Sequence, residues 1–281
     1  MSSSGTVTLA DGGELYYETA GAEISGELSV AELSGHAPLL TLIHPGLWDR
    51  RTWDREFDAW SDRFPMLRYD VRGFGRSSRL TGGPYSHARD LEALLDHLGI
   101  ERTALVGCSM GGGIAIDLAL LAPERVVALV LAASALGGFE PTEEEISWFE
   151  ERTAPVEAAI EAGELERAQD LRMGIWASMG TDDDAGKRIR QIAFENIHEL
   201  TMDESAELEL EPPAVLRLAE IDVPTLVLIA EHDPPFMRRC GELIGREVLD
   251  GRIARIEADH VINVRNPGAF EAEVLRFLSD I

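Results

Sequence analysis

The sequence predicts an α/β fold with a mostly parallel sheet, helices on both faces of the sheet and one inserted helical segment. Short, almost continuous apolar runs recur at residues 39–43, 104–106, 126–132 and 224–230. Such runs are typical of strands that are buried on both faces of a parallel sheet. Helical patterns lie between most of them, as βαβ units require. The alternation is interrupted between residues 137 and 212, where the chain is rich in Glu and Ala.

The first elements are predicted to be a hairpin and a loop. The residues flanking Asp11-Gly12-Gly13 alternate in polarity, and glycine accepts the turn conformations that a hairpin needs, so residues 6–18 should pair as two strands. Residues 20–37 are rich in Gly, Ser and Glu and are expected to form a loop. The apolar run at 39–43 then ends at His44-Pro45-Gly46, where a buried strand should meet a turn.

The next stretch predicts a helix, a strand and a second helix. Aromatic residues at three- and four-residue spacing favour a helix over 53–64, and residues 66–71 read as a strand. An amphipathic helix is expected over 88–98, with Gly99 as its C-terminal cap. Its apolar face would carry Leu91, Leu94, Leu95 and Leu98.

A tight turn at residues 107–111 joins the strand at 104–106 to an apolar helix over 112–122, which Pro123 ends. The strand at 126–132 completes this unit. After the insert, strands are expected at 224–230 and 252–257, and a closing helix at 270–278.

The insert divides the chain into a core of residues 1–136 and 213–281 and a helical cap of residues 137–212. The cap holds 21 acidic and 6 basic residues, a net charge of −15 within a total of −26. One hypothesis is that this acidity at the entrance of a site disfavours anionic substrates. The alternative is that these helices are simply the most exposed ones.

Composition excludes several classes of partner. With 51 acidic against 25 basic side chains among 281 residues, the surface should repel nucleic acid and anionic membranes. Cys108 and Cys240 are too few for a disulfide scaffold, and no metal-ligand spacing occurs, so we expect neither a metal nor a cofactor. With no signal peptide pattern and no apolar stretch of about 18 residues, we expect a cytoplasmic monomer or homodimer acting on a small molecule.

The clearest chemical motif is the Gly-x-Ser-x-Gly at residues 107–111. A strand precedes it and a helix follows it, which is the context of a nucleophile elbow. Such a turn lifts the Ser109 hydroxyl above the edge of the sheet, and the helix behind it offers free N–H groups to a developing negative charge. Ser109 is therefore the predicted nucleophile.

A serine hydroxyl needs a base, and the base needs an orienting acid. The chain order Ser, Asp, His favours His260 as base and Asp233 as acid. All three residues follow predicted parallel strands, and open α/β sheets place their sites at those strand ends. Glu231 remains a rival for the acid. We expect His44 to hydrogen-bond to the backbone near the turn that follows its strand, and Asp70 and Arg72 to tie a loop.

With these residues the chain resembles the α/β-hydrolase family, from about residue 6 to 280 apart from the insert, and within it the esterase and enol-lactonase-like serine hydrolases. The resemblance implies an eight-stranded, mostly parallel sheet with a cap at 137–212 and supports the triad Ser109, Asp233 and His260. The motifs that carry the resemblance are His44-Pro45-Gly46-Leu47-Trp48-Asp49, Tyr69-Asp70-Val71-Arg72-Gly73-Phe74-Gly75-Arg76-Ser77, Gly107-Cys108-Ser109-Met110-Gly111-Gly112, Glu231-His232-Asp233 and Asp259-His260.

The resemblance also implies an oxyanion hole made by backbone N–H groups of Met110 and of the His-Pro-Gly turn. Pro45 has no N–H, so the second donor is either Gly46 or Leu47. Where glycine commonly precedes the catalytic histidine, this chain has Asp259, whose carboxylate would either act on His260 or face solvent. Aromatic residues that would line an acyl or ring pocket are Trp48, Phe139, Trp148, Trp176 and Phe236.

A serine at the elbow excludes, as a primary activity, the epoxide and halide chemistry of relatives that use Asp there. The expected reaction is hydrolysis of a small carboxylic ester or lactone through an acyl-enzyme. Carbon–carbon bond hydrolysis and cofactor-free haloperoxidase-like chemistry use the same triad and remain alternatives. A ligand-binding relative without catalysis is a further alternative, which an intact triad disfavours.

Overall fold

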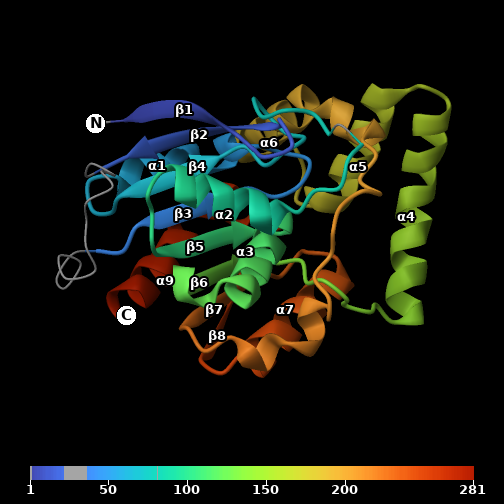
Figure 1. Ribbon diagram of the computed structural model, residues 1–281. Helices are drawn as coiled ribbons and strands as arrows, with labels where there is room; N and C mark the ends of the chain where they lie inside the picture. The colour runs from blue at the N-terminus through green and yellow to red at the C-terminus, as the bar shows by residue number, and fades with distance from the viewer. Residues whose placement is uncertain (1, 22–36, 81) are drawn as a thin grey trace.

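The computed structural model describes residues 2–21, 37–80 and 82–281, so most of the loop predicted at 20–37 lies outside the described residues. These residues form an eight-stranded sheet in the order β1-β2-β4-β3-β5-β6-β7-β8 (Figure 1). The first two contacts, β1 with β2 and β2 with β4, are antiparallel, and every later one is parallel. The predicted α/β class with a mostly parallel sheet is confirmed.

The predicted hairpin is present. Leu9 N–H donates to Gly13 O at 2.7 Å, and Gly12 adopts a φ of 86°, which glycine accepts without strain. The remaining strands follow the predicted apolar runs. The strand bounds are β1 Ser3–Thr8, β2 Glu14–Ala20, β3 Leu40–Ile43, β4 Met66–Tyr69, β5 Thr103–Cys108, β6 Val126–Ala132, β7 Thr225–Ala230 and β8 Gly251–Ile256.

Helices cover both faces of the sheet because successive strand side chains point to opposite faces. In β5, Leu105 belongs to a buried cluster that includes side chains of α2 (His87–His97), α3 (Met110–Leu121) and α7 (Pro235–Glu247). Its neighbour Val106 belongs to a second cluster, with side chains of α1 (Asp54–Trp60) and α9 (Pro267–Ser279). Both clusters consist almost wholly of buried aliphatic and aromatic side chains, so burial on both faces stabilises the central strands.

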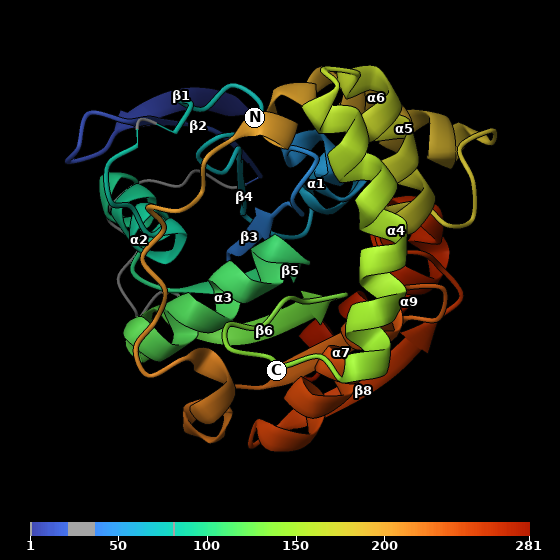
Figure 2. The same ribbon diagram turned by 90° about the vertical axis from the view of Figure 1, so that its right-hand side faces the viewer.

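The segment between β6 and β7 forms α4 (Glu143–Glu161), α5 (Leu165–Trp176), α6 (Asp184–Glu195) and a short 3-10 helix, Ile197–Thr201. These helices lie beyond the carboxyl ends of the parallel strands, with α4 outermost (Figures 1 and 2). The chain then returns along the core, where Leu208 N–H donates to Tyr85 O at 2.7 Å.

Some boundaries differ from the predictions. The helix expected over 53–64 is split into a 3-10 turn, Arg50–Trp53, and α1. Helix α3 begins two residues earlier than predicted, directly after Ser109. Sequence analysis missed α7 and the short α8 (Ile262–Arg265). No helix in the described part of the chain is long and apolar enough to cross a membrane.

Candidate active site

The turn between β5 and α3 has the backbone of a nucleophile elbow. Ser109 has a φ of 53° and a ψ of −117°, a conformation that is strained for a residue with a side chain. A Cβ on Gly107 would lie 2.2 Å from the carbonyl oxygen of Gly111, and a Cβ on Gly111 would lie 2.2 Å from that of Ile43. Both glycines are therefore required by close backbone approaches, and the Gly-x-Ser-x-Gly spacing follows from the geometry of the turn.

His260 and Asp233 form a buried pair at the same edge of the sheet. His260 Nδ1 lies 2.8 Å from Asp233 Oδ1, and the two side chains are 3% and 2% exposed. Since an ionised carboxylate only accepts hydrogen bonds, Nδ1 is the donor and Nε2 is left to accept a proton. Burial raises the pKa of Asp233, and the charge and hydrogen bond of His260 oppose that effect.

Strand order explains how residues 124 positions apart in the chain reach one place: Asp233 follows β7 and Ser109 follows β5, and β5 through β8 are parallel neighbours. The base is also held through its backbone, because Cys108 Sγ donates to His260 O at 3.5 Å. Among the described residues, no hydrogen bond joins Ser109 Oγ to His260. The structure therefore pairs the predicted base with the predicted acid, and the predicted nucleophile, Ser109, makes no hydrogen bond to that pair.

The rival acid is at the surface and makes no contact with His260 among those of the described residues. Glu231 is exposed, and the neighbouring His232 pairs with Glu257 on the surface. The position two residues later in the same loop, Asp233, is the one that contacts His260.

His44 organises the turn opposite the elbow. Its Nε2 accepts from Val71 N–H at 2.9 Å, and its Nδ1 donates to Pro45 O at 2.8 Å. Burial lowers the pKa of this histidine, so the neutral form with one donor and one acceptor is favoured. The expectation that His44 bonds to the backbone is confirmed.

The expected donors of the oxyanion hole are three backbone N–H groups in these turns. Among the described residues, the N–H groups of Met110, Gly46 and Leu47 have no hydrogen-bond acceptor assigned to them. For Met110 this follows from its place as the first residue of α3, because the first N–H groups of a helix have no partner within it. The two turns abut: a Cβ on Gly46 would lie 4.0 Å from the Cβ of Met110. Leu47 has a φ of 70°, which turns its peptide group sharply.

The charged residues after β4 are structural. Asp70 accepts from Arg50 Nη1 and from Arg76 N–H, both at 2.8 Å, and Arg72 pairs with Asp90 at 2.7 Å. These contacts tie the loop after β4 to its surroundings, as the sequence predicted.

Aromatic side chains from three helices meet beside the histidine. The ring of Trp176, at the end of α5, lies 4.4 Å from that of His260. Phe236 at the start of α7 and Phe149 of α4 are 5.2 Å apart and both contact Trp176 edge to face. Sequence analysis missed Phe149, although it shares a helix face with Val156, seven residues later.

The other three predicted pocket residues lie further from the imidazole or within the core. Trp48 is fully buried, its ring centre is 6.3 Å from that of His260, and its Nε1 donates to Ile189 O at 2.9 Å. Phe139 packs against the core under Arg239, and Trp148 lies under Arg152 on α4.

Asp259 neither faces solvent nor hydrogen-bonds to His260. Its side chain is buried against Arg265.

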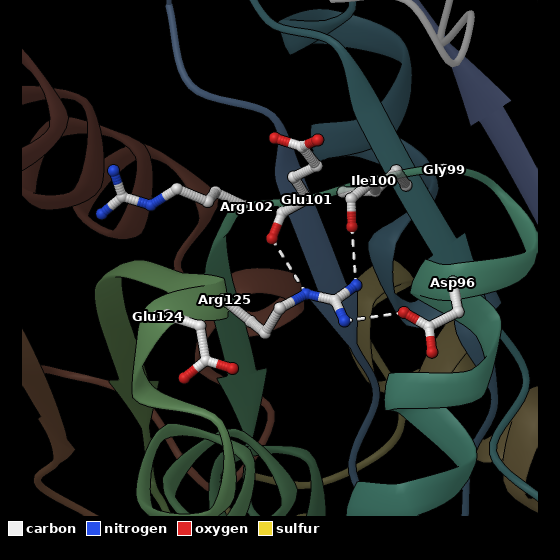
Figure 3. Close-up of a pocket in the computed structure, with 7 residues that line it drawn as sticks. All are labelled: Asp96, Gly99, Ile100, Glu101, Arg102, Glu124 and Arg125. Carbon is white, nitrogen blue, oxygen red and sulfur yellow. Dashed lines mark hydrogen bonds and ion pairs between the residues drawn. The ribbon is translucent and has the colours of Figure 1, made fainter. Parts of the chain in front are cut away.

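A surface hollow lies at the opposite edge of the sheet from these residues, since it surrounds the residues that precede β5 and β6 (Figure 3). Arg125 in that hollow is fully engaged, with Asp96 and the carbonyls of Ile100 and Glu101. The hollow is lined by Asp96, Gly99, Ile100, Glu101, Arg102, Glu124 and Arg125.

Comparison with known proteins identifies the fold family. A family model described as alpha/beta hydrolase fold matches residues 38–245. The chain is 28% identical over 242 residues to 3-oxoadipate enol-lactonase 2 of Acinetobacter baylyi, covering 80% of this chain and 84% of that protein. It is 47% identical over 72 residues to 2-hydroxymuconate semialdehyde hydrolase of Pseudomonas putida, covering 25% and 26%. A crystal structure of a hydrolase from Pseudomonas aeruginosa is similar with a TM-score of 0.72 and 28% identity, covering 98% of each chain.

Proposed function

The chain belongs to the alpha/beta hydrolase fold family, and from this premise we propose that it is a serine hydrolase of small carboxylic esters or lactones. The observation that carries the proposal is the buried His260–Asp233 pair at the same sheet edge as the strained Ser109. A strained residue at a strand end and a buried histidine–carboxylate pair are each costly for stability, and catalysis accounts for both.

In the proposed mechanism, Ser109 Oγ attacks the substrate carbonyl while Nε2 of His260 takes its proton. Asp233 holds Nδ1 and stabilises the imidazolium that forms. The tetrahedral oxyanion is bound by the N–H of Met110 and by that of Gly46 or Leu47. His260 then returns the proton to the leaving oxygen, which yields an acyl-enzyme. A water molecule, activated by the same histidine, attacks the acyl carbonyl and releases the acid and free Ser109.

Residues 137–212 are proposed to act as a cap over this centre, with Trp176, Phe149 and Phe236 as the apolar surface that receives the substrate. The mutual contacts of these rings, and the position of Trp176 against His260, support that role. The similarity to an enol-lactonase over most of both chains favours an ester or lactone bond. The shorter match to a semialdehyde hydrolase keeps carbon–carbon bond hydrolysis as the second candidate, because the same triad serves it.

Replacing Ser109 with Ala tests the mechanism. Purified protein should hydrolyse p-nitrophenyl acetate and butyrate, and the Ser109→Ala variant should lose about 10⁶-fold in kcat, which takes turnover to background. The matched control is Ser147→Ala, since Ser147 is an exposed serine on α4 and its loss should leave turnover unchanged. Turnover that persists in Ser109→Ala would exclude Ser109 as the nucleophile.

A further inference from the structure

The carboxylate next to the proposed base takes part in a buried ion pair. Asp259 Oδ2 lies 2.8 Å from Arg265 Nη2, and the side chains of Arg265 and Asp259 are 2% and 1% exposed. A second contact of 3.1 Å joins Oδ1 to Arg265 Nε, so the pair has the two-pronged geometry that makes such contacts strong. Asp259 precedes His260 directly, and Arg265 ends α8, the short helix that follows the histidine.

The same two side chains also hold the segment that joins α5 to α6. Met179 N–H donates to Asp259 Oδ2 at 3.1 Å, and Arg265 Nη2 donates to Gly180 O at 2.9 Å. Arg265 Nη1 reaches Asp183, whose side chain is 65% exposed, at 3.1 Å. The two charged side chains of this pair are therefore shielded from water, whereas the residues that they hold, Met179, Gly180 and Asp183, lie at the surface.

A further contact reaches this segment from the loop of the proposed acid. Ser178 Oγ donates to the carbonyl oxygen of His232, the residue before Asp233, at 2.9 Å. Residues 178–183 are thus attached to both loops that carry the His260–Asp233 pair. Trp176 lies two residues before the first of these contacts and is the last residue of α5. The segment therefore begins directly after the helix whose last ring lies against His260.

We propose that Asp259 and Arg265 are positioning residues that hold Trp176 against His260 and thereby determine how well acyl groups larger than acetyl are received. This inference rests on the proposed serine hydrolase function. A buried ion pair is expensive to form and can often be replaced by apolar residues at no loss of stability. This pair binds three groups of residues 178–183, namely Met179 N–H, Gly180 O and the Asp183 carboxylate. Because these residues follow Trp176, the pair is connected to the surroundings of His260.

Coupling between Asp259 and Trp176 distinguishes positioning from a general effect on stability. Four proteins are compared: the wild type, Asp259→Asn, Trp176→Ala and the double variant. We expect Asp259→Asn to lower kcat/KM for p-nitrophenyl butyrate about tenfold, and that for the acetate about twofold. In the Trp176→Ala background the same substitution should have no further effect on the butyrate, because the ring that it positions is gone.

Two further variants make the outcome decisive. If Asp259→Asn does not fold, Arg265→Lys replaces it in the cycle, since lysine keeps a cation beside Asp259 but lacks the fork that reaches Gly180 and Asp183. The control Asp183→Asn removes the exposed charge that pairs with Arg265 and keeps an oxygen that can cap α6 by accepting from Gly186 N–H. It should change kcat/KM less than twofold, as exposed pairs contribute little. Equal losses on both esters, or losses that add to those of Trp176→Ala, would overturn the proposal.

Failure of this inference and failure of the proposed function give different results. Covalent labelling of Ser109 by a fluorophosphonate reports the nucleophile and does not need a bound acyl chain. If the wild type is labelled at Ser109 and the losses are additive, the positioning role is wrong while the hydrolase function stands. If Ser109 is never labelled and Ser109→Ala is fully active, the proposed function itself is wrong.

Discussion

The two sides of the helical insert are attached to the core in different ways. On the α6 side, Asn196 Nδ2 donates to Asp49 at 2.8 Å, and Asn196 Oδ1 accepts from Gly75 N–H at 2.8 Å. Trp48 Nε1 donates to Ile189 O, and an apolar cluster joins the loop of Leu47 and Trp48 to α6. These are buried contacts that reach the loop proposed to form the oxyanion hole.

On the α4 side, contacts with the core are fewer and closer to water. Glu145 pairs at 2.7 Å with Arg239, whose side chain is 40% exposed, and Phe149 contacts Phe236. The rest of α4 packs on α5, and Pro155 interrupts its hydrogen bonding. From this comparison we expect α4 to open at a lower cost in free energy than α6.

The largest expected difference is in stability. Asn196→Ala should lower the free energy of unfolding by about 3 kcal/mol, because Asp49 and Gly75 N–H lose a buried partner. Glu145→Gln should cost less than about 1 kcal/mol, since glutamine keeps an oxygen that can accept from Arg239, whose side chain is 40% exposed. Urea unfolding of both variants measures the two values. Equal losses would contradict the distinction between the two sides.

The pH dependence of stability should also come from the α6 side. Burial alone raises the pKa of Asp49, but hydrogen bonds from Arg51 and Asn196 outweigh it and lower the pKa to about 2. The contribution is therefore present above the unfolded value of 3.8 and is lost as the pH falls through about 2.

The contribution of the Asp49 carboxylate to the free energy of unfolding amounts to about 2 kcal/mol. Comparing wild type with Asp49→Asn by urea unfolding at pH 5, 4 and 3 should show the difference shrinking toward low pH. A difference that is constant over this range would mean that Asp49 is not the group responsible.

The smallest expected difference is in local opening. Amides in the central turns of α4 should exchange with deuterium about tenfold faster than those of α6, because the polar contact of α4 with Arg239 lies in its first turn. Hydrogen exchange with peptide-level mass spectrometry resolves the two helices. Slower exchange in α4 than in α6 would reverse the comparison.

The sequence predicts those features of the structure whose residues are close together along the chain. The sheet and the elbow were predictable because strands buried on both faces leave continuous apolar runs, and because close approaches leave only glycine at positions 107 and 111. Helix α7 was missed, since its buried face includes Cys240 and Gly241 and it begins at two prolines that read as a turn.

Contacts distant in sequence left no such signal. Trp48 was predicted as a pocket residue from its type, but its bond to Ile189 spans 141 positions and depends on where the insert folds back. Asp259 stands where glycine is common. No pattern in the neighbouring sequence indicated that its side chain pairs with Arg265 or accepts a hydrogen bond from Met179 N–H.

The central claim, that Ser109 is a nucleophile activated by His260 and Asp233, is tested most directly by the rate at which a fluorophosphonate labels the protein. We expect a single covalent adduct that peptide mapping places on Ser109, absent in Ser109→Ala. Labelling should be about 10⁴-fold slower in Asp233→Asn and unchanged in Glu231→Gln. Labelling that is absent in the wild type, or slowed by Glu231→Gln and not by Asp233→Asn, would contradict the claim.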